Sequence, residues 1–89
     1  MTMIDELNAS EVLALARFLE ACRRLRGTSR WRTQFYECAR RGSFLPFAGQ
    51  ADAQQLTRLV AARGALVVCL MTTDELLRAA REQSAAIAG

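Results

Sequence analysis

Apolar side chains recur at intervals of three and four residues in four segments of the chain, a spacing that is typical of amphipathic helices. The segments are Ala9 to Arg26, Arg30 to Arg41, Ala51 to Arg63 and Asp74 to Ile87, with a short turn at Met3 to Leu7 before the first. We therefore expect an all-α fold, a compact bundle of about four short helices, in which residues 1–89 form a single domain.

Residues at the ends of these segments also indicate helices. Asn8 with Glu11, and Thr72 with Glu75, have the spacing of a capping box, in which each residue bonds a free backbone N–H at a helix start. Glycine follows arginine at three predicted helix ends, where glycine supplies the left-handed backbone that ends a helix. These pairs are Arg26-Gly27, Arg41-Gly42 and Arg63-Gly64.

The first helix carries apolar residues over more than half of its circumference, which is wider than a one-sided stripe. An arc of this width predicts that the helix contacts neighbours on two sides and is the central element. Its apolar residues are Val12, Leu15, Ala16, Phe18, Leu19, Cys22 and Leu25.

Two connecting segments are unusually apolar. The first, residues 42–50, places Phe44, Leu45 and Phe47 around the only proline, so it must pack against another surface. The second, Ala65 to Met71, has adjacent β-branched residues and no polar alternation. It is either a buried helical turn or a lone strand that pairs with a second copy across a two-fold axis, because a single strand leaves its backbone groups unpaired.

Composition narrows the possible chemistry. The 89 residues include no His and no Lys, and all 12 basic residues are Arg, giving a formal net charge of +3. The chain therefore has no histidine general base, no histidine metal ligand and no Schiff-base lysine. Its acidic pairs sit at helix starts, where the helix dipole accounts for them. We expect a protein that is not an enzyme.

The positions of the cysteines also indicate a protein without a metal or catalytic site. Cys22, Cys38 and Cys69 are 16 and 31 residues apart and each falls in an apolar stripe, so we expect buried thiols and neither a metal site nor a cofactor. An odd number of cysteines favours a reducing, cytoplasmic setting. The longest apolar run has seven residues, too few to cross a membrane.

Positive charge is concentrated between Arg17 and Arg41, a segment that contains eight arginines and only two acidic residues. In the second helix Trp31, Phe35 and Cys38 form the core stripe, and a neighbouring stripe carries two arginines around a tyrosine. Tyrosine and arginine are enriched at the energetic centres of protein interfaces. The residues that we expect to bind a partner are Arg23, Arg26, Arg30, Arg32, Tyr36, Arg40, Arg41, Phe44 and Phe47.

These features predict a small accessory or inhibitor protein that binds a larger protein with an acidic surface. The alternative is a nucleic-acid-binding protein that uses Arg17 to Arg41 as a phosphate contact. Glu20 with Arg24 and Glu37 with Arg41 have the spacing of helix-surface ion pairs. The two apolar segments are too large for the thin third and fourth helices to cover, so we also expect a homodimer.

Overall fold

The computed structural model describes residues 7–26 and 31–88, and the side chains of residues 7–25 and 31–85. This part of the chain forms five helices and no strand, so the predicted all-α fold is confirmed. The predicted turn at Met3 to Leu7 lies, except for its last residue, outside the described residues. The helices are α1 (Ala9–Arg26), α2 (Trp31–Arg41), α3 (Gln50–Arg63), α4 (Ala65–Cys69) and α5 (Thr73–Ala88).

Both capping sequences act at helix starts as predicted. The Glu11 backbone N–H donates to Asn8 Oδ1 at 2.8 Å, and the Asn8 backbone N–H donates to Glu11 Oε1 at 3.1 Å. This reciprocal pair opens α1. At the start of α5 the Glu75 backbone N–H donates to Thr72 Oγ1 at 3.2 Å.

Glycine ends two of the helices by adopting a left-handed backbone. Gly42 follows α2 with φ of 78°, and Gly64 follows α3 with φ of 89°. The Gly64 N–H still bonds Val60 O, and the chain then turns directly into α4. A Cβ added at either position would have no atom within 4 Å other than those of the adjacent residues, so it would not clash. A side chain there would be strained only because the backbone has a positive φ.

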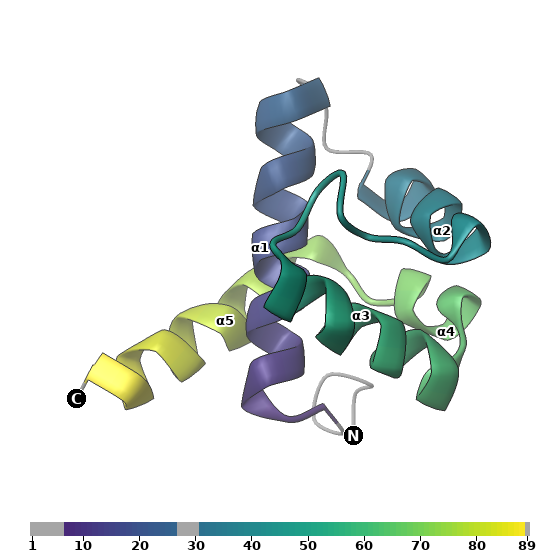
Figure 1. The fold of residues 1–89 in the computed structure, drawn as a ribbon. Coiled ribbons are helices and arrows are strands. Elements are labelled where there is room, and N and C mark those ends of the chain that lie inside the picture. Colours follow the sequence, from purple (N-terminus) through teal and green to yellow (C-terminus); the bar gives the residue numbers. More distant parts are fainter. Residues whose placement is uncertain (1–6, 27–30, 89) are drawn as a thin grey trace.

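Helix α1 is the central element, as its wide apolar arc predicts. It packs against α2, α3 and α5 (Figure 1). Phe18 of α1 is fully buried, and its ring meets those of Phe35, Phe44 and Phe47 edge-on at centroid distances of 5.5 to 5.8 Å. Edge-to-face aromatic pairs of this kind add about 0.5 to 1.5 kcal/mol each beyond the area they bury.

This aromatic cluster corrects one prediction. Phe44 and Phe47, expected to contact a partner, are buried against α1 in the monomer. Only Leu45 and Pro46 between them are exposed. The segment does pack against another surface, as its composition requires, but that surface belongs to its own chain.

The structure also decides between the two alternatives for residues 65–71. They form the short helix α4 and a turn, with Val68 and Met71 buried, so the strand alternative is wrong. The backbone groups that a lone strand would leave unpaired are bonded within the helical turns, since Leu70 N donates to Val67 O and Met71 N donates to Val68 O.

The five helices form a compact body from which one end of α5 extends. Its radius of gyration is 12.0 Å, close to the value of about 12 Å expected for a compact chain of this length. Helix α5 crosses α1 and its C-terminal half runs outward, away from α2 and α4 (Figure 1). The faces on opposite sides of α1 are therefore built from different helices: α2 with α4 on one side, and α5 on the other.

Candidate protein-binding surface

The structure separates the nine predicted partner-binding residues into three groups. Phe44 and Phe47 belong to the core, and the Arg26 side chain and the whole of Arg30 lie outside the described residues. The other five are exposed. They are Arg23 on α1 and Arg32, Tyr36, Arg40 and Arg41 on α2.

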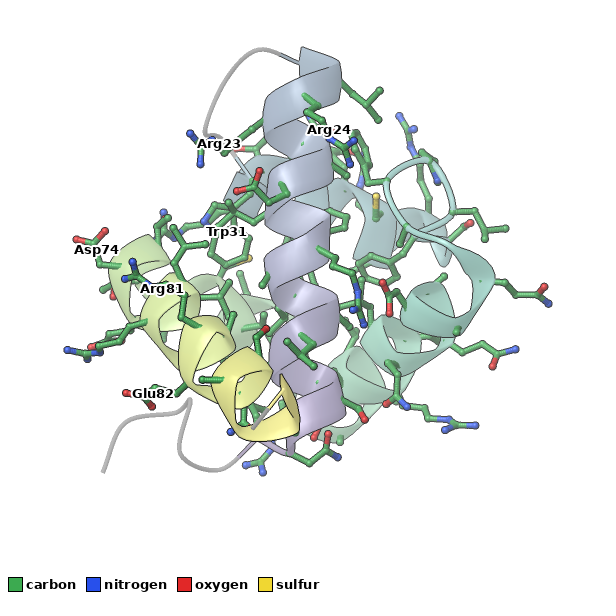
Figure 2. The ribbon with its side chains drawn as sticks, turned by 90° about the vertical axis from the view of Figure 1, so that its left-hand side faces the viewer. Arg23, Arg24, Trp31, Asp74, Arg81 and Glu82 are labelled. Carbon is green, nitrogen blue, oxygen red and sulfur yellow. The ribbon has the colours of Figure 1, made fainter. Side chains whose placement is uncertain are left out.

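Helix α2 is held in place by its buried face. Trp31, Phe35 and Cys38 are all buried, which confirms the predicted core stripe. The Trp31 indole N–H donates to Thr73 Oγ1 at 3.0 Å, so the start of α2 is fixed to the start of α5. Figure 2 shows Trp31 beside α1 on the side where α5 begins. With this face inward, Tyr36 points outward and is 44 % exposed.

Arg32 has a structural role that the sequence does not reveal. Its Nε donates to Cys69 O at 3.0 Å and its Nη2 donates to Met71 O at 2.7 Å. Its guanidinium also lies 5.0 Å from the centre of the Trp31 ring. The carbonyls at the end of α4 therefore receive a cation, as helix C-termini prefer, and Arg32 is committed to holding α4 against α2.

Helix α4 and the residue directly after it each expose a leucine. Leu66 is 68 % exposed and Leu70 is 80 % exposed, although Val68 between them is fully buried. Positions four apart share one side of a helical turn. Five residues are too few for a helix to be stable in isolation, so packing of its buried side must hold α4 in place while the two leucines remain in solvent.

Tyr36 and Leu66 meet at one hollow. This shallow depression of about 300 Å³ is lined by residues of α2 and α4. Its polar edges are Arg32, Thr33 and Glu37. We define the α2/α4 surface as Tyr36, Arg40, Leu66 and Leu70 together with this hollow.

Some of the exposed arginines form ion pairs within the described part of the chain. Arg40 Nη2 lies 2.9 Å from Glu37 Oε2, and Arg23 Nη1 lies 3.3 Å from Glu20 Oε1. Both pairs span three residues, so the predicted four-residue pairings with Arg41 and Arg24 are wrong. The hydrogen bond from Arg40 and its positive charge lower the pKa of Glu37, and the same hydrogen bond with the negative charge of Glu37 raises the pKa of Arg40.

Arg17 forms a longer-range pair, with two hydrogen bonds of 2.7 and 3.0 Å to the Asp52 carboxylate. This pair joins α1 to α3. In the part of the chain that the structure describes, no ion pair involves Arg24 or Arg41. Among the arginines of the Arg17 to Arg41 region whose side chains the structure describes, four therefore have a partner within the chain and two do not form an ion pair.

The cysteines are only partly as predicted. Cys22 and Cys38 are buried, which confirms their assignment to the core. Cys69 is half-buried, and its Sγ lies 3.6 Å from Arg32 O. Burial raises the pKa of the Cys38 and Cys69 thiols. Within the described residues, His, Cys, Asp and Glu form no group of three that could hold a metal ion.

Comparison with protein-family models, curated proteins and solved structures finds no match to this chain. None of the described helices combines the length and apolar character needed to cross a membrane.

Proposed function

We propose that this chain is a small non-enzymatic accessory or inhibitor protein that binds a larger protein through the α2/α4 surface. One observation carries the proposal: Tyr36, which is 44 % exposed, and Leu66, which is 68 % exposed, line the same hollow. Single exposed apolar residues are common, whereas apolar residues gathered around one depression mark binding sites. Burying a leucine fully contributes about 1.5 to 3 kcal/mol, so a few such contacts supply most of a protein interface.

Charge supports a partner with acidic character near the edge of this surface. Arg41 lies just over one turn beyond Tyr36 at the end of α2, is exposed and forms no ion pair among the described residues. Polar and charged groups at the rim of an interface select the partner and speed association more than they add affinity. An acidic patch beside an apolar one is therefore the surface that the chain would recognise.

The nucleic-acid alternative has less support. Arg32 is committed to the α4 carbonyls, and Arg17, Arg23 and Arg40 each have an acidic partner. Phosphate binding would have to compete with these contacts. Leu66 and Leu70, in addition, offer nothing to a phosphate backbone.

Affinity capture with the tagged full chain from a lysate of its source cells tests the proposal. We expect a protein that stays bound after nuclease treatment, is lost with Leu66→Glu and is weakened by Tyr36→Ala. The matched control is Leu25→Glu on α1, where the leucine has a similar exposure of 65 %. Circular dichroism would verify that all variants are helical.

Two outcomes would contradict this function. If the Leu66→Glu variant captures the partner as strongly as the Leu25→Glu control, the α2/α4 surface is not the binding site. Capture that disappears on nuclease treatment would favour the nucleic-acid alternative instead.

A further inference from the structure

A second surface hollow lies on the other side of α1, between α1 and α5. It is a groove of about 770 Å³. Its apolar floor consists of Leu13 and Ala16 from α1 with Leu77 and Ala80 from α5, and charged side chains line it on both helices. Figure 2 looks onto this side of the molecule, where α5 runs past α1.

Two charged side chains at the ends of one face of α5 form no ion pair with the described residues. Asp74, Leu77, Arg78 and Arg81 have the spacing of one helix face, and all four line the groove. Asp74 and Arg81, labelled in Figure 2, are seven residues or about 10.5 Å apart along the helix. Among the described residues no ion pair involves either of them. The face therefore has an acid at one end, Leu77 and Arg78 in its middle and Arg81 at the other end.

A helix face with this order of charges is complementary to an antiparallel copy of itself. When two such helices meet about a two-fold axis beside Leu77 and Arg78, position 74 of each faces position 81 of the other. Asp74 then faces Arg81 of the second copy twice. Beside the axis, Leu77 of each copy faces Arg78 of the other, whose aliphatic stem can cover the leucine. A two-fold contact requires this kind of self-complementarity.

We infer that the α1/α5 groove is a homodimer contact in which α5 of one copy lies antiparallel against α5 of a second. The groove also favours a second copy over a strongly charged peptide, because its walls balance three arginines with three acids. The contact is separate from the α2/α4 surface, so it leaves that surface open and does not depend on the proposed function.

Charge reversal provides a direct test with the full chain. The variants are Asp74→Arg, Arg81→Asp, the double variant and the control Glu82→Arg, whose residue does not line the groove. Sedimentation equilibrium up to about 0.5 mM protein measures association for each, since contacts of modest size have dissociation constants in the micromolar to millimolar range.

We expect the wild type and Glu82→Arg to dimerise. Each single reversal within the groove should weaken the dimer by about ten-fold or more, because it places like charges opposite each other twice. The double variant restores both attractive contacts and should dimerise within about three-fold of the wild type.

An equimolar mixture of Asp74→Arg and Arg81→Asp gives the sharpest result, because every opposing pair in the mixed dimer is again of opposite sign. The mixture should form a heterodimer although each variant alone is largely monomeric. A monomeric wild type, single variants that dimerise like Glu82→Arg, or a mixture that stays monomeric would each overturn the inference.

Discussion

Arg32 joins α2 to the end of α4 through contacts that span 37 and 39 residues of the sequence. Its planar guanidinium directs two N–H groups at the Cys69 and Met71 carbonyls while stacking on Trp31. A lysine ammonium is a compact point charge and does not have this fork of fixed donors. The position of α4, and with it that of Leu66, therefore depends on one side chain of α2.

Replacing Arg32 with Ala should lower the free energy of unfolding by about 1 to 2 kcal/mol. Hydrogen bonds from a charged donor contribute somewhat more than this when buried, and the value is reduced here because the Arg32 side chain is partly exposed. Arg32→Lys should recover only part of this loss. Urea denaturation measures the effect, with Arg24→Ala as the control because no described residue forms an ion pair with Arg24. Equal losses for Arg32→Ala and Arg24→Ala would show that the two carbonyl bonds contribute no stability.

The three thiols should differ in reactivity. A thiol reagent should modify half-buried Cys69 first, and buried Cys22 and Cys38 slowly in the folded protein. Since burial raises the pKa of Cys69, its thiolate forms only at higher pH than that of free cysteine. The labelling rate of Cys69, followed by mass spectrometry, should rise with pH along a curve shifted upward from that of free cysteine. Fast labelling of Cys22 and Cys38 without denaturant would contradict their burial.

At the scale of the helices, local sequence signals predict the boundaries well. The reciprocal Asn8 and Glu11 bonds, the Thr72 cap and the glycines after α2 and α3 depend only on residues close in sequence. The sequence could not place Phe44 and Phe47, because their burial depends on α1, which lies more than twenty residues earlier in the chain. The role of Arg32 escaped prediction for the same reason, since its acceptors are distant backbone carbonyls.

The two glycines at the ends of α3 should respond oppositely to substitution. Gly64 has φ of 89° and ψ of 143°, a conformation that side chains disfavour, so Gly64→Ala should destabilise the fold by about 1 to 3 kcal/mol. Gly49 is the N-cap of α3, with φ of −68° and no side-chain cap bond, so Gly49→Ser should stabilise by about 0.5 kcal/mol. Thermal denaturation of both variants checks the signs. A neutral Gly64→Ala would show that the α3 to α4 turn is unstrained.

For the whole molecule, α1 separates two faces of different character. One carries the hollow lined by Tyr36 and Leu66, and the other carries the charged groove between α1 and α5. The helices that build these two faces, α2 with α4 for the first and α5 for the second, lie on opposite sides of α1 (Figure 1). The predicted homodimer was based on the apolar segments 42–50 and 65–71, but the structure buries much of both within one chain. The two proposals therefore assign the partner protein to the α2/α4 surface and the second copy to the α1/α5 groove.

The most direct test of the account is a titration of the captured partner against single variants at two salt concentrations. Tyr36→Ala and Leu66→Ala should each weaken binding by about ten-fold or more, as expected where a few apolar contacts dominate. Arg24→Ala should change it by less than about two-fold, and salt should have a small effect. Similar losses for every arginine variant, a salt slope near −0.9 per phosphate contact, and no effect of Tyr36→Ala would contradict the account and establish nucleic-acid binding instead.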